Sequence, residues 1–316
     1  LNTFRTTLRK RLSALGEEIN ISQRLKRRES IINKLGIDTS MRLSQMQDIG
    51  GLRVVLPSVR VLRELETMYA KKPTQQFPHE LRPNMDYINN PRDADGYRSL
   101  HLIFRYQKNA GPKEYNGLLL ELQLRTKLQH YWATAVETLE TFLKQPIKSR
   151  KRNPESEWVD FFRVVSSAFA HIENLPLVPR YSKLSKEETF LRVAVMNDKL
   201  HVLDQLKSFR LVADMVIKRK DKKAVYHIIL LNHEKRTGQL FSYAEQYLSS
   251  AKEMYAELES QAANGAPIDS VLVSVTSISN LRRDYPSFFL DTRQFIDAVE
   301  NQIIKKVKNT PKSNVS

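Results

Sequence analysis

The opening of the chain has the apolar spacing of an α-helix. Its apolar residues recur at intervals of three and four, which places them on one helical face: they are Phe4, Leu8, Leu12 and Leu15. A second apolar run, around Ile31 and Leu35, ends at Gly36, and glycine commonly follows a helix C-terminus. The pattern predicts that residues 1–35 are helical.

Strand-like segments follow. The Val-rich run Leu52–Leu56 ends at a proline and predicts a strand, with a helix-like stretch over 62–69 after it. Residues 77–97 hold three prolines and many Asn and Asp residues. We therefore expect a long loop there, and long loops in compact domains are often functional. Two further strands are predicted over 101–106 and 118–124, the second with leucines and polar residues in alternation.

Two helices complete this first region. Thr126 and Gln129 have the spacing of a capping box, and the helix that follows carries Trp132 on its apolar face. A second amphipathic helix is predicted over 158–172. We therefore expect a first domain over residues 1–175.

The pattern restarts after Pro176 and Pro179, which mark a linker. Ser185 and Glu188 then have the spacing of a helix cap. The elements expected beyond the linker are a helix to about residue 217, a hairpin of 225–231 and 240–243 with Gly238 in its turn, a helix over 244–259 capped by Ser242 and Glu245, a strand over 270–275 and a helix over 291–303. They predict a small C-terminal α+β domain over 185–307, for which the sequence indicates no role.

Composition narrows the classes of partner and site. The chain has 316 residues, no cysteine and a formal net charge of +16. Without cysteine there are no disulfides, thiolate metal sites or cysteine nucleophile. The positive charge indicates a polyanionic partner such as nucleotide phosphates or RNA, and the alternative is a generally basic surface. No apolar run approaches the roughly 20 residues of a membrane span. We expect a cytoplasmic protein that does not enter a membrane, and a homo-oligomer stays open.

Several common sites are absent from the sequence: it has no G-x-x-x-x-G-K, no G-x-G-x-x-G, no H-x-x-x-H and no G-x-S-x-G. What remains are two acids near strand ends, Asp48 before the first predicted strand and Glu121 on the polar face of a later one. Two carboxylates on neighbouring strands suit Mg²⁺, which prefers oxygen ligands. The alternative is that each acid pairs with a nearby arginine.

A basic stripe and an aromatic residue supply candidate binding groups. On a helix, Lys26, Ser30 and Lys34 share one face, where they can hold a triphosphate. The planar guanidinium of Arg24 can stack on a base. The alternative for this segment is an exposed basic helix. Tyr97 follows a glycine at the mouth of a strand and can stack on a purine, or it is a packed surface aromatic.

Four motifs in this order resemble the synthetase domain of RelA/SpoT-type proteins. They are Arg24-x-Lys26-x-x-x-Ser30-x-x-x-Lys34, Asp48-Ile49-Gly50-Gly51-Leu52-Arg53, Gly96-Tyr97-Arg98-Ser99-Leu100-His101 and Glu121-Leu122-Gln123-Leu124-Arg125-Thr126. The resemblance covers about residues 15–145. It implies an α+β fold with a mixed β-sheet flanked by helices, related to nucleotidyltransferases.

The resemblance also implies a role for each matched residue. ATP would be held by five side chains: Arg24, Lys26, Ser30, Lys34 and Arg53. The two acids, Asp48 and Glu121, would bind Mg²⁺, and Glu121 would also act as the general base. The acceptor nucleotide would lie against five further side chains: Tyr97, Arg98, His101, Gln123 and Arg125.

The implied activity is that of a stand-alone pyrophosphokinase without a hydrolase domain. It would transfer the β,γ-pyrophosphate of ATP to the 3′-hydroxyl of GDP or GTP and make (p)ppGpp. Two places depart from the family pattern and leave the acceptor open: Met85 and the loop Arg92-Asp93-Ala94-Asp95. The alternatives are a toxic relative that pyrophosphorylates the 3′ end of tRNA or adenosine nucleotides, and a non-catalytic module that binds RNA or a ribosome.

Overall fold

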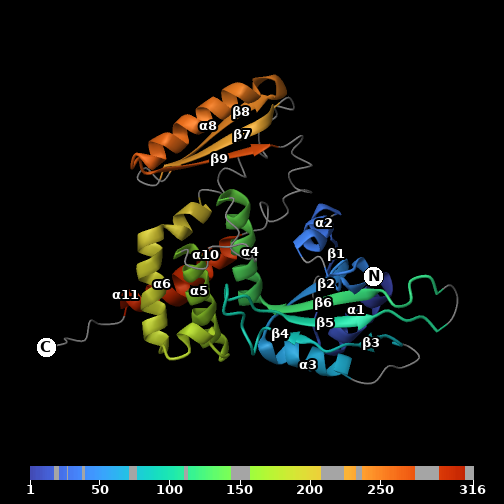
Figure 1. Ribbon diagram of the computed structural model, residues 1–316. Coiled ribbons are helices and arrows are strands. Elements are labelled where there is room, and N and C mark those ends of the chain that lie inside the picture. The colour runs from blue at the N-terminus through green and yellow to red at the C-terminus, as the bar shows by residue number, and fades with distance from the viewer. Residues whose placement is uncertain are drawn as a thin grey trace. The chain divides into compact units, whose positions relative to one another are not determined.

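The chain forms two compact units in the computed structural model (Figure 1). The first unit comprises Leu1–His130 with Phe169–Pro179, and the second comprises Tyr131–Ala168 with Arg180–Ser316. The structure describes residues 1–17, 21–26, 28–37, 40–70, 77–109, 113–143, 157–207, 224–232, 237–274 and 292–309. The unit boundaries place 131–168 with the C-terminal part of the chain, whereas the sequence pattern assigned them to the first domain. That residues 1–175 and 185–307 are two domains with separate roles stays a prediction.

A mixed sheet forms the centre of the first unit, as expected. Its strands are β1 (Ile21–Leu25), β2 (Gly50–Leu56), β3 (Glu80–Leu81), β4 (Met85–Asp86), β5 (Leu100–Arg105) and β6 (Leu119–Thr126). The order is β1-β2-β6-β5-β3, and β4 also pairs with β5. β2 and β6 run parallel, and the other pairs are antiparallel. The two short strands β3 and β4 lie inside the segment 77–97 that we expected to be a loop.

One face of this sheet carries the hydrophobic core of the first unit. Alternate residues of the three central strands, such as Leu52 and Leu56 of β2, point to this face and are buried. They pack against helices α1 (Asn2–Ala14) and α3 (Val59–Ala70), which contribute Leu8 and Leu62 to the core. Full burial of each such side chain stabilises the fold by roughly 1.5–3 kcal/mol. The opposite face of the sheet carries most of the polar side chains of the central strands, together with a few apolar ones such as Ile103.

The prediction of helix over residues 1–35 is wrong in its middle. Helix α1 ends at Ala14, β1 follows, and helix α2 begins only at Arg28 and ends at Ile37. β1 adds to the edge of the sheet, with Arg24 opposite Gly51 of β2. The backbone hydrogen bonds of that pairing outweigh a helical spacing of apolar residues that is too short to be decisive.

The helix that leaves β6 begins as predicted. The amide of Thr126 donates to Gln129 Oε1 at 3.2 Å, and the amide of Gln129 donates to Thr126 Oγ1 at 3.4 Å, which is the reciprocal pattern of a capping box. Helix α4 spans Lys127–Leu143 and helix α5 spans Glu157–Glu173. The prediction for 158–172 is therefore confirmed.

The second unit contains further helices and a small antiparallel sheet. The helices are α6 (Lys186–Leu200), α8 (Leu248–Ala263), α10 (Arg293–Val299) and α11 (Lys305–Asn309), with a π-helical segment η5 (Glu300–Ile304) and short 3₁₀ turns η2 (Pro179–Tyr181) and η3 (Glu245–Tyr247). The strands are β7 (Ala224–Asn232), β8 (Thr237–Ala244) and β9 (Ile268–Ser274), in the order β8-β7-β9. The expected hairpin, third strand and flanking helix are thus present.

Three C-terminal boundaries differ from the prediction. Ser185 caps α6 as expected, but the helix ends at Leu200 instead of near residue 217, because His201 has a left-handed backbone with φ of 51°. Residues 202–207 are helical again, and 208–217 lie outside the described residues. Gly238 pairs with Leu231 inside β8 and is not in the turn. Ser242 also lies in β8, and α8 begins at Leu248 without a side-chain cap.

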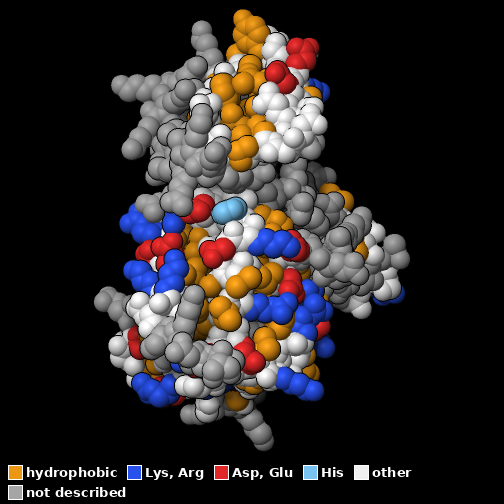
Figure 2. Space-filling view, turned by 90° about the vertical axis from the view of Figure 1, so that its left-hand side faces the viewer, with side chains coloured by type: hydrophobic (Ala, Val, Ile, Leu, Met, Phe, Trp, Pro, Cys, Tyr) orange, Lys and Arg blue, Asp and Glu red, His pale blue; other side chains and the backbone are white. Residues whose placement is uncertain are grey.

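On the face drawn in Figure 2, the Lys and Arg side chains do not form one separate basic patch. There, Lys and Arg side chains lie among Asp and Glu side chains, around apolar surface (Figure 2). In the part of the chain that the structure describes, no helix is long and apolar enough to cross a membrane.

Candidate active site

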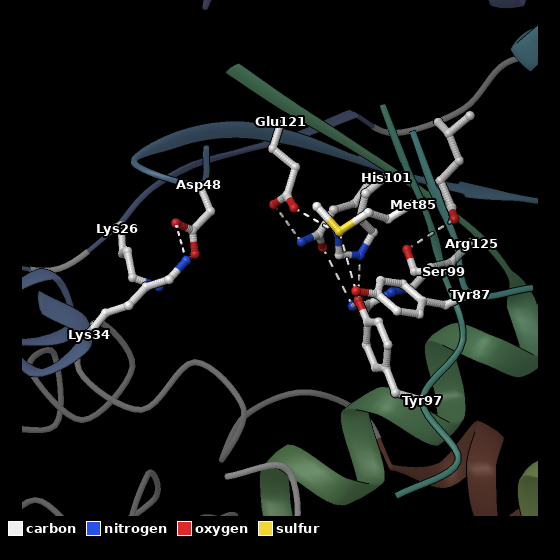
Figure 3. A network of polar contacts seen from close by, with 12 residues as sticks. Lys26, Lys34, Asp48, Met85, Tyr87, Tyr97, Ser99, His101, Glu121 and Arg125 are labelled. Carbon is white, nitrogen blue, oxygen red and sulfur yellow. Dashed lines mark hydrogen bonds and ion pairs between the residues drawn. The ribbon is translucent and has the colours of Figure 1, made fainter. Parts of the chain in front are cut away.

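The register of three strands places the candidate residues on one face of the sheet, which we call the polar face. Along β6, Glu121, Gln123 and Arg125 alternate with the buried leucines and therefore point away from the core. His101 of β5 lies opposite Gln123, and Gly51 of β2 lies opposite Glu121. Residues that are distant in sequence thus meet above β6 (Figure 3).

Asp48 is held between two lysines. It lies in the segment before β2, and Lys26 lies just after β1, where its amide donates to the carbonyl of Ile49 at 2.8 Å. Lys26 Nζ is 2.9 Å from Asp48 Oδ2, and Lys34 Nζ, from α2, is 3.0 Å from Asp48 Oδ1 (Figure 3). Burial raises the pKa of the Asp48 carboxyl, but the bonds and charges of the two lysines outweigh burial and hold that pKa below its usual value.

Glu121 has two partners of its own. His101 Nδ1 lies 2.8 Å from Glu121 Oε1, and Gln123 Nε2 donates to Glu121 Oε2 at 2.7 Å. Burial raises the pKa of the Glu121 carboxyl and the charge of Asp48 raises it further, but His101 and Gln123 outweigh both and lower it. For His101, burial lowers the pKa, and the bonds to Glu121 and Tyr97 outweigh burial and raise it. The pair therefore favours a carboxylate beside a protonated imidazole.

Tyr97 closes the cluster from the far side of His101. Its hydroxyl lies 2.8 Å from His101 Nε2 and accepts from Arg125 Nη2 at 2.7 Å. Burial raises the pKa of this hydroxyl, but the charges of Arg125 and His101 outweigh burial and lower it to about 7. The side chain is only 7% exposed. The ring is thus not presented as an open shelf here, and stacking of Tyr97 on a purine stays a prediction that requires the ring to become more accessible.

The remaining candidates divide into two groups. Arg98 is buried away from the cluster, and its guanidinium donates to the carbonyls of Ile88 at 2.9 Å and Pro176 at 2.7 Å. This geometry favours a structural role for Arg98 over the predicted contact with the acceptor. The backbones of Arg24, in β1, and Ser30, in α2, are placed, but their side chains lie outside the described residues. Arg53 is half-buried on β2, opposite Gln123.

Gly51 keeps the space beside Glu121 open. A Cβ at this position would lie 3.0 Å from the backbone oxygen of Glu121 and 3.7 Å from its Cβ. Any larger residue would therefore press on the strand that carries the central carboxylate. The glycine explains how β2 and β6 can pair closely while Glu121 stays accessible to its polar neighbours.

Two supporting residues were missed by sequence reasoning. Asp95 is fully buried, where its carboxylate accepts from the amide of Tyr97 at 3.0 Å and binds the guanidinium of Arg92. It fixes the turn in which Gly96 has a φ of 84°, and this places Tyr97. An aspartate two residues before an amide it accepts from is the signature of an Asx turn, so this signal was present. Tyr87, whose ring edge meets the His101 ring at a centroid distance of 5.4 Å, offered no such signal.

The two carboxylates suit a shared divalent cation. The charge of Asp48 raises the pKa of Glu121, and a cation bound by both carboxylates would relieve that repulsion. Among the described residues there is no group of three or more His, Cys, Asp or Glu side chains that could hold a metal by itself. One or two carboxylates completed by substrate phosphates is the usual protein site for Mg²⁺. The donor set therefore fits Mg²⁺, whose binding stays a prediction.

Comparisons with known proteins match the part of the chain in which the candidate site lies. Residues 23–141 match the family described as "Region found in RelA / SpoT proteins", and this stretch contains both carboxylates. The GTP pyrophosphokinase YjbM of Bacillus subtilis (strain 168) is 31% identical over 102 residues, which cover 31% of this chain and 43% of that protein. The match thus spans less than half the length of this curated relative.

Solved structures with weaker likeness were also found. The small alarmone synthetase 1 from Bacillus subtilis, bound to its product pppGpp, is 23% identical with a TM-score of 0.43, covering 54% of this chain and 84% of that one. The small alarmone synthetase 2 from the same organism is 21% identical with a TM-score of 0.43, covering 55% and 88%. A GTP pyrophosphokinase family protein from Streptococcus pneumoniae is 22% identical with a TM-score of 0.41, covering 54% and 81%.

Proposed function

We propose that this chain, whose residues 23–141 carry the region found in RelA and SpoT proteins, is an ATP:nucleotide 3′-pyrophosphokinase. It transfers the β,γ-pyrophosphate of ATP to the 3′-hydroxyl of GDP or GTP and makes (p)ppGpp. The observation that carries the proposal is that Asp48 and Glu121 lie in the matched stretch, each with its own cationic partners, and that the charge of Asp48 acts on Glu121.

The ATP side of the site lies towards β1 and α2. Lys26 and Lys34 both form ion pairs with Asp48. A triphosphate carries more negative charge than one carboxylate and competes for both ammonium groups. We propose that ATP takes these lysines, with Arg53 and the predicted Arg24 and Ser30 as further contacts, and that Asp48 is released for its own role.

Asp48 and Glu121 are the residues that would hold Mg²⁺. When bound, the ion neutralises the charge that develops on the transferred group and on the leaving phosphate. The lysines and Arg53 contribute to the same neutralisation from the protein. Because phosphoryl-type transfer depends mainly on positioning and charge, these groups account for most of the catalysis that the fold offers.

We propose Glu121 as the general base. Its carboxylate takes the proton of the acceptor 3′-hydroxyl while the 3′-oxygen bonds to the β-phosphorus of ATP. The bond between that phosphorus and the oxygen that bridges it to the α-phosphate breaks, and AMP leaves with the electron pair. The low pKa of Glu121 keeps it ionised at neutral pH. His101 orients the carboxylate through the 2.8 Å contact to Oε1.

The acceptor nucleotide binds on the side of Tyr97, His101, Gln123 and Arg125 in this proposal. These side chains form one connected set of hydrogen bonds that ends at Glu121. A 3′-hydroxyl that bonds to Glu121 therefore meets a group whose orientation is already fixed, which is the main requirement for efficient proton transfer.

The proposal is tested by product analysis. Protein incubated with ATP, Mg²⁺ and GDP or GTP is expected to yield AMP and a 3′-pyrophosphorylated guanosine nucleotide, resolved by anion-exchange chromatography. Glu121→Gln keeps the shape and removes the base, and it should reduce the rate by about 10²–10⁴. Arg60→Gln, in an exposed pair on α3, is the matched control and should leave the rate unchanged. Absence of any such product with the wild-type protein contradicts the proposal.

A second candidate acceptor is the 3′ end of tRNA or an adenosine nucleotide. The net charge of +16 and the loop in which buried Asp95 binds Arg92 favour it, because the first attracts RNA and the second consumes a cation beside the acceptor side. With ATP labelled in the β-phosphate, deacylated tRNA should then acquire label. Label that stays off the tRNA while guanosine nucleotides are modified removes this candidate.

A further inference from the structure

We propose that a second phosphate-binding site lies beside the two carboxylates, in a pocket built around Arg82 and Arg105. The cavity measures about 450 Å³ and is lined by Ser44, Gln47, Arg82, Arg105, Gly117 and Leu119, among others. We call it the arginine pocket. None of these side chains belongs to the four motifs that indicated the function, so the pocket is an addition to the proposed site.

The register of the strands joins the pocket to the active site. Arg105 of β5 pairs with Leu119 of β6, and two residues further along, Ile103 pairs with Glu121. Side chains two apart on a strand point to the same face, roughly 7 Å from each other along the strand. Gln47 immediately precedes Asp48. The register thus puts Arg105 on the polar face that also carries Glu121, and Gln47 links the lining of the pocket to Asp48 along the chain.

The positive charge of the pocket is only partly neutralised by its surroundings. Within the described part of the chain, the half-buried guanidinium of Arg82 has no hydrogen-bond or ion-pair partner, although its amide donates to Ile103. Arg105 Nε lies 3.7 Å from Glu80 Oε2, and both side chains are about half exposed, at 44% and 54%. Exposed ion pairs of this kind contribute little free energy, so the pair with Glu80 leaves Arg105 able to bind an anion.

Another arginine of the same unit shows the usual arrangement. The guanidinium of Arg63 contacts Glu66 at 2.8 Å and Asp86 at 2.9 Å, so that carboxylates surround it. A half-buried arginine that lines a cavity without such partners is instead available to an anion from outside the chain. Arg82, together with Arg105, whose pair with Glu80 is long and exposed, favours a ligand with several negative oxygens.

The chemistry of the lining selects a phosphate. Guanidinium groups present a planar fork of N–H donors that matches two phosphate oxygens. The carboxamide of Gln47 and the hydroxyl of Ser44 add neutral donors, and Leu119 gives the floor an apolar part. The volume is within the range of small-molecule sites. A nucleotide phosphate group, and not an apolar ligand, is therefore the class that we expect.

Two sources supply such a group, and they are distinguishable. One is the 5′-phosphate chain of the acceptor nucleotide, whose 3′-hydroxyl lies at Glu121; this assignment rests on the proposed function. The other is a separate nucleotide that binds next to the active site. In the first case, the pocket determines how much the affinity for the acceptor depends on its number of phosphates. In the second case, the pocket is an additional nucleotide-binding site.

Calorimetric titration tests the pocket without catalysis. The donor side is first saturated with α,β-methylene ATP, whose bridge between the first two phosphates cannot be cleaved. Guanosine, GMP, GDP and GTP are then titrated into wild-type protein and the double variant Arg82→Gln/Arg105→Gln. The control is Arg9→Gln/Arg60→Gln, which removes the same charge from exposed positions on α1 and α3.

We expect the affinity of the wild-type protein to rise at least about tenfold from guanosine to GTP, since charge-assisted bonds to a phosphate are strong. The double variant should lose this rise in affinity, while its affinity for guanosine should be unchanged. A lost rise at one binding site identifies the acceptor as the source. Loss of a second GTP site with the first unaltered identifies a separate nucleotide. Arg105→Lys, which keeps the charge without the fork, should give an intermediate affinity.

Equal GTP affinity in the double variant and the wild-type protein, with both folded by circular dichroism, overturns the inference. The same holds for an equal loss in the control variant, because the effect would then be one of net charge. Failure of the proposed function gives a different result, namely no binding of the ATP analogue or no transfer product. In that case, binding of the pyrophosphate anion to the wild-type protein and to the double variant still tests the arginine pocket.

Discussion

At the scale of single residues, the site is a chain of paired charges in which each acid has cations to itself. Asp48 contacts two lysines, and Glu121 contacts His101, which is linked through Tyr97 to Arg125. Such pairing keeps both carboxylates ionised at neutral pH in spite of partial burial. In the proposed function, an anionic substrate competes with the Asp48 carboxylate for Lys26 and Lys34.

Tyr97 is expected to ionise near neutral pH. Its pKa is lowered to about 7 by the charges of Arg125 and His101 against the effect of burial. Since the cations favour the phenolate, removing one of them in Arg125→Gln must move the pKa of Tyr97 upward. Ultraviolet titration of tyrosinate should therefore show one group near pH 7 in the wild-type protein. That group should disappear in Tyr97→Phe and shift to higher pH in Arg125→Gln.

A titration near pH 7 that persists in Tyr97→Phe would show that another group is responsible. The sign for stability follows from the same shift. A group with a lowered pKa in the folded state adds stability as the pH rises through about 7 towards the ordinary tyrosine value of about 10. Tyr97→Phe should lose that increment over this pH window.

Arg98 is expected to act on stability and not on the acceptor. Its guanidinium satisfies the carbonyls of Ile88 and Pro176 inside the first unit. Arg98→Met leaves both acceptors without these donors, which should lower the free energy of unfolding by about 2–5 kcal/mol. Denaturant unfolding measures the loss, and acceptor titration of the folded variant should give the wild-type affinity. A weakened acceptor affinity at unchanged stability would restore the predicted role of Arg98 in binding.

At the scale of elements, strands and caps were predictable because their signals are local. The alternation of leucines and polar residues in β6 predicted both the strand and its polar face, and the pair Thr126 and Gln129 predicted the start of α4. The strand β1 was not predictable in this way. It is held by pairing with β2, a long-range interaction that has no counterpart in the spacing of its own five residues.

The candidate site was predictable to a similar extent. The order of the motifs identified five candidate residues: Asp48, Glu121, His101, Gln123 and Arg125. The sheet register places the last four of them together. The partners of each charge were not predictable, because they depend on side-chain geometry across elements. The contacts of Lys26 and Lys34 with Asp48, and the burial of Arg98 and Tyr97, are of this kind.

Gly51 is expected to be essential to the pairing of β2 with β6. A methyl group there would lie 3.0 Å from the backbone oxygen of Glu121. Gly51→Ala should therefore cost about 1–3 kcal/mol of stability and reduce the transfer rate about tenfold or more, since small displacements of catalytic groups are costly. The matched control is Gly36→Ala in α2, where a Cβ meets nothing within 4 Å.

Gly36→Ala should stabilise the protein by about 0.5–1 kcal/mol, because alanine is the better helix former, and should leave the rate unchanged. Thermal unfolding and steady-state kinetics on both variants check the pair. Equal changes in stability and rate in the two variants would show that the position of Gly51 beside Glu121 matters for neither property.

At the scale of the whole molecule, the proposed chemistry belongs to the first unit. The matched stretch, residues 23–141, contains all strands of the mixed sheet except the first two residues of β1. The second unit has a three-stranded sheet that contacts α8, and further helices. The face drawn in Figure 2 mixes both signs of charge, so the net charge of +16 does not by itself identify RNA as a partner.

The measurement that tests the central claim most directly follows both terminal phosphates of ATP at once. Wild-type protein is incubated with GDP or GTP and with ATP labelled separately in the β- and the γ-phosphate. Pyrophosphate transfer predicts that both labels appear in the guanosine product, with one AMP formed for each product molecule, and that Glu121→Gln suppresses all three signals together. Transfer of the γ-label alone, with ADP as the second product, would contradict the account, because it would show attack at the wrong phosphorus.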